Sequence, residues 1–141
     1  MCFLNLVGYN PGVEMNMKNL IGKCHCGKNI FTMTAEPEFQ FICYCNNCRV
    51  LNSGGHLCGM LFDETKFIEA KDTQHYTYQG GSGNPIIMHF CPACATHLYA
   101  YPTVYKGKVV IRANTLEDSN FKPQQCIFTE SAFPWDKPVT A

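Results

Sequence analysis

Apolar and polar residues alternate in several short segments of the chain, and this alternation predicts β-strands. In 30–34, Phe31 and Met33 fall on one side while Thr32 and Thr34 fall on the other, as in a strand with one buried face. Further strands are expected in 39–43, 56–62, 75–79, 86–90, 98–101 (or 104–105), 109–113 and 125–128. Only 46–52 and 63–68 suit a helical turn or two. The pattern therefore predicts a mainly β fold of short strands with little helix.

Turns and loops separate these segments without dividing the chain. Residues 80–85, which read Gly-Gly-Ser-Gly-Asn-Pro, predict a loop, and 105–109 predict a hairpin tip. The 141 residues contain no low-complexity stretch or linker, so we expect one domain with its own core. We expect 1–17 to be a leader or to contain an edge strand at 3–7, and the domain itself to cover 18–138.

The charge balance argues against a surface built for nucleic acid. Eleven Lys plus Arg residues offset eleven Asp plus Glu residues, and neither sign gathers into a run. The apolar stretch at the N-terminus is short, contains Asn5 and has no basic residue before it, which does not fit a signal peptide. No segment approaches the ~18 apolar residues of a membrane helix. We therefore expect a cytoplasmic protein, whose thiols stay reduced and tend to bind metal or react.

Cysteine spacing is the most informative feature of the chain. Seven of the ten cysteines form three tight groups, namely Cys24 with Cys26, Cys43 with Cys45 and Cys48, and Cys91 with Cys94. A structural zinc takes four protein ligands, whereas a catalytic zinc takes three and leaves one coordination position open. Seven thiols in groups of two, three and two therefore predict one closed site with four cysteine ligands and one open site with three.

Three other uses of these cysteines fit less well. Disulfides are disfavoured by the Cys-x-Cys spacing and by the expected reducing compartment. A redox pair at Cys91 and Cys94 would lie at the N-terminus of a helix. The segment that follows is short, rich in Tyr and ends at Pro102, which does not suit such a helix. The usual ferredoxin spacings of iron–sulfur proteins are absent. Zinc is the favoured metal.

The grouping of the ligands follows from their positions. Cys43, Cys45 and Cys48 lie within six residues, so one turn can wrap one metal ion. The two remaining pairs would then clamp distant parts of the chain, where a metal clip stabilises most. Gly22 and Gly27 bracket the first pair, and we expect them to provide the positive φ of a tight turn.

A zinc ion with three thiolates is a soft, electron-rich centre. Its site carries a net charge of about −1, which makes it a poorer generator of hydroxide than a three-histidine zinc. It suits another soft ligand, a thiol held as thiolate, and thus the making or breaking of a carbon–sulfur bond. The alternative is a second structural zinc completed by a histidine, for which the candidates are His56, His75, His89 and His97.

The motifs together resemble a known family. Gly-Lys-Cys-His-Cys-Gly at 22–27, the three cysteines followed by Arg49 and Gly54, and Phe-Cys-x-x-Cys-x-Thr at 90–96 occur in this order, and the tail from 114 to 135 agrees as well. The chain from about 18 to 138 resembles the glutathione-dependent formaldehyde-activating enzymes, a family that includes centromere protein V domains. The resemblance implies a twisted, zinc-stabilised β-sandwich like that of a small Rab-accessory zinc protein.

The resemblance also implies roles for the cysteines. It places a structural zinc on Cys24, Cys26, Cys91 and Cys94 and a catalytic zinc on Cys43, Cys45 and Cys48, giving two zinc ions per chain. The expected activity is a carbon–sulfur lyase that joins a glutathione-like thiol to a small aldehyde such as formaldehyde. We expect Arg49 to assist catalysis, with Asn47, His56 and His89 as further helper candidates. The alternative function is a non-catalytic, zinc-stabilised interaction module. Neither nucleic acid nor membrane is an expected partner.

Overall fold

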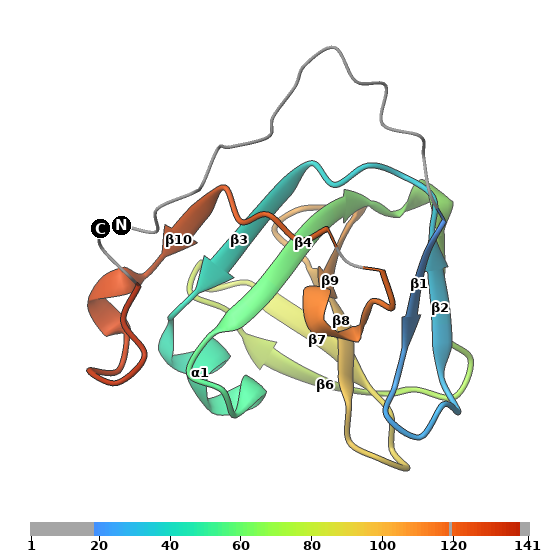
Figure 1. The fold of residues 1–141 in the computed structure, drawn as a ribbon, viewed down its shortest axis with the longest axis horizontal. Helices are drawn as coiled ribbons and strands as arrows, with labels where there is room; N and C mark the ends of the chain where they lie inside the picture. Colours follow the sequence, from blue (N-terminus) through green and yellow to red (C-terminus); the bar gives the residue numbers. More distant parts are fainter. Residues whose placement is uncertain (1–18, 119, 139–141) are drawn as a thin grey trace.

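The computed structural model describes residues 19–118 and 120–138, and these form a mainly β domain with one short helix (Figure 1). The predicted leader and edge strand at 1–17 lie outside the described residues. The elements are β1 (Leu20–Lys23), β2 (Ile30–Met33), β3 (Phe39–Cys43), α1 (Asn46–Asn52), β4 (Leu57–Asp63), η1 (Glu64–Lys66), β5 (Phe67–Ile68), β6 (Gln74–Gln79), β7 (Pro85–Phe90), β8 (His97–Pro102), β9 (Lys108–Arg112), η2 (Ala113–Thr115), β10 (Gln125–Ile127) and η3 (Thr129–Ser131).

Two sheets build the domain. The larger has the strand order β10-β3-β4-β9-β8-β7-β6, and the smaller has the order β1-β2-β5. All pairs in the larger sheet are antiparallel except β10 with β3, which is parallel. In Figure 1, β10 lies beside β3 at one side of the molecule, and β1 and β2 lie at the opposite side. The prediction of a mainly β fold with little helix is confirmed.

The core lies where the small sheet meets one face of the large sheet. Phe31 from β2 and Tyr99 from β8 are fully buried, and their ring centroids lie 5.4 Å apart in an edge-to-face arrangement. Phe67 from β5 completes the group, with its ring 5.6 Å from Phe31 and 4.8 Å from Tyr99. Edge-to-face pairs of this kind add to the stabilisation that burial provides.

The large sheet carries apolar side chains on both of its faces. In β9, Val109 and Ile111 pack in the core, so Val110 between them points to the opposite face. In β4, Phe62 likewise belongs to the core, and its neighbour Leu61 pairs in register with Val110 on the opposite face. The second apolar face explains why β9 reads as a continuous hydrophobic run and not as an alternation.

Most expected strands occur within one or two residues of their predicted ends. Two short strands were missed, because β1 has four residues and β5 has two, and neither shows a clear alternation. The segment 63–68 forms the single turn η1 and then β5. Among the residues with a described structure, no helix is long and apolar enough to cross a membrane.

Candidate metal centres and substrate cavity

The first thiol group, which we call the closed cluster, joins two turns far apart in sequence. Cys24 and Cys26 lie between β1 and β2, while Cys91 and Cys94 lie between β7 and β8, and all four Sγ atoms lie within 4.8 Å of one another. The Sγ of Cys26 is 3.6 Å from that of Cys24 and 3.8 Å from that of Cys91. A tetrahedral zinc ion with bonds of about 2.3 Å holds its sulfurs about 3.8 Å apart. The thiols therefore have the spacing that a closed zinc site needs.

Backbone groups shape the first turn of the closed cluster. Gly27 has φ +80°, as predicted, and the Asn29 N–H donates to the Cys24 Sγ over 3.2 Å. The prediction for Gly22 was wrong, because its φ is not positive and it lies within β1. Its role is close packing, since a Cβ at Gly22 would lie 1.9 Å from the Cζ of Phe31. The packing of Phe31 against β1 therefore requires a glycine at this position, whereas the turn does not.

The second turn of the closed cluster contains a residue in an unusual conformation. Ala95 has φ +65°, and its N–H donates to the carbonyl oxygen of Cys91 over 2.7 Å. A hydrogen bond of 3.2 Å joins the Cys94 Sγ to the Thr96 hydroxyl and lowers the pKa of Cys94 to about 5. A lowered thiol pKa favours the thiolate, which is the form that binds metal.

The second thiol group, which we call the open cluster, consists of Cys43, Cys45 and Cys48. Cys43 ends β3, Cys45 caps the N-terminus of α1, and Cys48 lies within α1. The cap places the three sulfurs together, because the Cys48 N–H donates to the Cys45 Sγ over 3.4 Å. The three Sγ atoms lie within 4.8 Å of one another. Among the described residues, no histidine or carboxylate joins them, so the predicted alternative of a histidine-completed second zinc finds no support.

The thiols of the open cluster affect one another's ionisation strongly. Hydrogen bonds from Cys43 and then from Cys48 lower the pKa of Cys45 to about 2. The hydrogen bond with Cys45 raises the pKa of Cys43 to about 11, and the hydrogen bonds with Cys43 and Cys45 raise the pKa of Cys48. Three thiolates this close repel one another unless a cation lies between them. The donor set therefore fits a soft divalent metal such as zinc.

The open cluster lies in the wall of a cavity of about 580 Å³, which we call the main cavity. Tyr78 from β6 and Arg112 from β9 line the cavity together with the three thiols. Much of the remaining wall is apolar and comes from the second face of the large sheet. These apolar residues include Phe39, Phe41, Leu57, Leu61, Ile86, Ala100, Pro102 and Val110.

Arg112 is the buried charge of this site. It is 3% exposed, and its Nε has no hydrogen-bond partner among the described residues. Burial lowers the pKa of Arg112, while neighbouring Tyr78 and Cys48 act in the opposite direction. A buried guanidinium needs polar or anionic partners, and Tyr78 and the thiols of the open cluster supply them.

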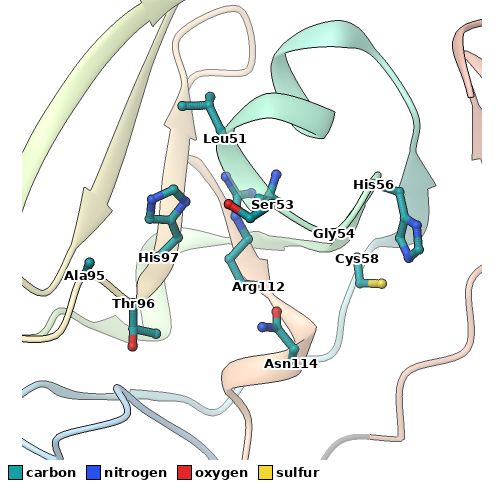
Figure 2. A pocket seen from close by; sticks show the side chains of 11 residues that line it. Leu51, Ser53, Gly54, His56, Cys58, Ala95, Thr96, His97, Arg112 and Asn114 are labelled. Carbon is teal, nitrogen blue, oxygen red and sulfur yellow. The ribbon is translucent and has the colours of Figure 1, made fainter. Parts of the chain in front are cut away.

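Arg112 also lines a second cavity of about 410 Å³, which Figure 2 shows from close by. Ser53 and Gly54 border it from the segment after α1, and His97 and Asn114 border it from β8 and η2. Figure 2 places the Arg112 side chain between these groups. Arg112 therefore lines both the second cavity and the main cavity.

The predicted helper residues lie in different places. Asn47 lines the main cavity, and its Nδ2 donates to the Gln79 carbonyl oxygen over 3.1 Å. Arg49 lies on α1 but does not line the cavity. Its Nη2 donates to the Asn46 Oδ1 over 3.0 Å, and its guanidinium carbon lies 4.2 Å from the Phe133 ring centroid.

Two predicted histidines belong to other surroundings. The His56 Nδ1 lies 2.6 Å from the Asp136 Oδ2, and His56 lines the second cavity. The His89 Nδ1 lies 3.0 Å from the Thr73 hydroxyl, and its ring stacks on core residue Tyr99. The structure therefore does not bring either histidine to the open cluster. Arg112 and Tyr78 were not among the residues predicted for the site, although Arg112 ends an apolar run of the sequence, which is a usable signal.

Comparisons with known proteins agree with this geometry. The family model described as glutathione-dependent formaldehyde-activating enzyme matches residues 19–131. A crystal structure of a Rhodobacter sphaeroides protein is similar, with a TM-score of 0.50 and 19% sequence identity over 71% of this chain and 90% of that one. At this identity the likeness concerns the fold alone. A search of curated proteins found no significant match.

Proposed function

Because this chain belongs to the glutathione-dependent formaldehyde-activating enzyme family, we propose that it is a zinc-dependent carbon–sulfur lyase. Its reaction joins glutathione or a similar thiol to a small aldehyde such as formaldehyde, and in reverse it breaks the same bond. One observation carries the proposal: three clustered thiols and a buried arginine face one cavity. A mainly structural zinc protein would have no need of a buried guanidinium beside the thiols.

The two clusters take different parts in this proposal. The closed cluster would hold a structural zinc, because four thiols complete a tetrahedral set. Cys43, Cys45 and Cys48 would hold a second zinc, which when bound supplies an open position for a soft anionic ligand such as a thiolate. A place in the cytosol, where thiols stay reduced, would keep the seven cluster cysteines available to bind metal.

The chain's own residues provide the remaining chemistry. In the forward reaction the thiol sulfur attacks the carbonyl carbon, a carbon–sulfur bond forms, and the carbonyl electron pair moves onto oxygen. We assign to Arg112 the donation of hydrogen bonds to that oxygen as its negative charge develops, because Arg112 lines the cavity and its burial strengthens such an interaction. The oxygen then takes the proton that the thiol released, so no oxidant or reductant is needed.

Polar residues at the α1 end of the cavity would orient the thiol substrate. Asn47 lines the cavity and is held by its bond to the Gln79 carbonyl oxygen. Arg49 would act through its neighbours, because it holds Asn46 and stacks on Phe133, so we assign it a positioning role. Its expected contribution to catalysis is therefore indirect.

The test is the rate of S-hydroxymethyl adduct formation from glutathione and formaldehyde. The zinc-loaded protein should raise this rate above the uncatalysed rate, and Cys48→Ser should abolish the gain. Cys58→Ser is the matched control, because Cys58 belongs to neither cluster and does not line the main cavity. No gain with the native, zinc-loaded protein would contradict the proposal.

A further inference from the structure

The wall of the main cavity is unusually apolar for the substrates discussed so far. Apart from the thiols, Arg112 is the only side chain with a full charge among the described residues that line the main cavity. Formaldehyde has a single carbon and almost no apolar surface to bury. Glutathione carries two carboxylates and an ammonium group, and burying these against apolar walls would be costly. Neither molecule accounts for the apolar part of the cavity.

The sheet builds this apolar wall in a regular way. Phe39 of β3 pairs with Leu61 of β4, Leu61 with Val110 of β9, and Val110 with Ala100 of β8. All four residues line the main cavity, so they form a continuous apolar row across four strands. We call this row, together with Phe41 and Leu57 on the same face of β3 and β4, the apolar wall.

The apolar wall begins next to the thiols and leads away from them. Cys43 pairs with Leu57 at one end of β4, and Leu61 lies four residues further along the same strand. At about 3.3 Å per residue, these positions are about 13 Å apart. A substrate held at the open cluster can therefore lay an apolar group of several carbons along the strands.

The polar part of the lining lies elsewhere in the cavity. Asn46 and Asn47 come from α1, and Ser82 and Asn84 come from the loop between β6 and β7. Asn46, Ser82 and Asn84 are exposed, so charged ends of a thiol substrate can stay in contact with water there. The polar part of the lining then contacts the thiol substrate, and the apolar wall contacts the other reactant, the aldehyde.

We infer that the aldehyde of this enzyme carries an apolar chain or ring of several carbons, which packs along the apolar wall while its carbonyl carbon faces the open cluster. This inference rests on the proposed function and narrows its substrate. The balance of the reaction is unchanged: the thiol sulfur bonds to the carbonyl carbon, and the thiol proton ends on the new hydroxyl.

Binding of product-like thioethers tests the inference without turnover. S-hexylglutathione and S-methylglutathione differ by five methylenes, and each buried methylene is expected to strengthen binding about fourfold. Calorimetry on the zinc-loaded protein should show S-hexylglutathione binding at least tenfold more tightly. Equal affinities would overturn the inference. This measurement does not depend on catalysis, so its result stands apart from that of the proposed lyase activity.

Turnover provides the second measurement. With glutathione as the thiol, kcat/KM for hexanal should exceed kcat/KM for formaldehyde by at least tenfold. If formaldehyde reacts and hexanal reacts no faster, the proposed function stands and the inference fails. If S-hexylglutathione binds tightly but neither aldehyde reacts, the apolar site stands and the proposed function fails.

Two cavity variants and one control locate the effect. Val104→Trp changes a partly exposed cavity residue in the β8–β9 connection and should reduce the preference for S-hexylglutathione at least fivefold. Leu61→Gln places a polar group in the apolar wall and should do the same. Ile68→Ser is the control, because Ile68 is exposed on β5 and lies outside the cavity. An unchanged preference in folded Val104→Trp, or an equal loss in Ile68→Ser, would overturn the inference.

Discussion

The ring of Phe41 lies over Gly59 of the neighbouring strand, where a Cβ would come within 2.6 Å of the ring Cζ. The two residues pair in register, and Gly59 also pairs with Arg112 on its other side. Gly59 therefore lies in register between Phe41 and Arg112, two residues that line the main cavity. The absence of a side chain there sets the position of the Phe41 ring.

Gly59→Ala should destabilise the protein by about 1–3 kcal/mol, because the added methyl group must displace the Phe41 ring. Urea unfolding of the zinc-loaded protein measures the change. Gly54→Ala is the matched control, since a Cβ at Gly54 meets only the Asn52 carbonyl oxygen at 3.6 Å. Equal stabilities of the two variants would show that Phe41 moves at no cost.

Ala95→Gly should have the opposite effect and stabilise the protein by about 1 kcal/mol. Ala95 has φ +65°, where a Cβ is strained and glycine is not. The extra freedom of glycine in the unfolded chain offsets part of the gain. Thermal unfolding at fixed zinc concentration checks this prediction, and a lower melting temperature for Ala95→Gly would contradict it.

The two clusters should respond differently to loss of a ligand. Cys91→Ser breaks the closed cluster, which joins turns far apart in sequence, so we expect unfolded or insoluble protein. Cys48→Ser should leave a folded protein with one zinc ion in place of two. Circular dichroism and elemental analysis of both variants provide the comparison. If Cys48→Ser also unfolds or becomes insoluble, as expected for Cys91→Ser, both zinc ions are structural.

Arg112 should matter for catalysis more than for metal binding. Arg112→Met should lower kcat by about 10²-fold or more, because it removes the charge that faces the developing oxyanion. Arg112→Lys should recover part of this loss, since it restores a positive charge. Both variants should keep two zinc ions by elemental analysis. An unchanged kcat in Arg112→Met would remove Arg112 from the mechanism.

The three tight sets of cysteines could be predicted from the sequence because each set is local. Cys43, Cys45 and Cys48 are brought together by one strand end and one helical turn, and this needs no knowledge of strand pairing. The same local reasoning pointed to Arg49, which follows Cys48. Consecutive residues on a helix point about 100° apart, however, and Arg49 therefore turns away from the cavity that Cys48 faces.

The apolar wall and Arg112 could not be predicted in the same way. Arg112 belongs to the site because β9 pairs with β4 in a register that places Arg112 opposite Gly59, and register is a property of the assembled sheet. His89 shows the reverse case. It pairs with Tyr99, whose side chain is in the core, so an attractive candidate for acid–base chemistry lies on the wrong face of the sheet.

The central claim is that the open cluster holds a substrate thiol as its thiolate, and calorimetric titration of the zinc-loaded protein with glutathione tests it most directly. A free thiol has a pKa of about 8.5, and coordination lowers it, so binding near neutral pH should release about one proton per chain. Titrations in two buffers of different ionisation enthalpy measure that proton. We predict one glutathione bound and about one proton released in the native protein, and neither in Cys48→Ser. Absence of both binding heat and proton release at millimolar glutathione would contradict the account.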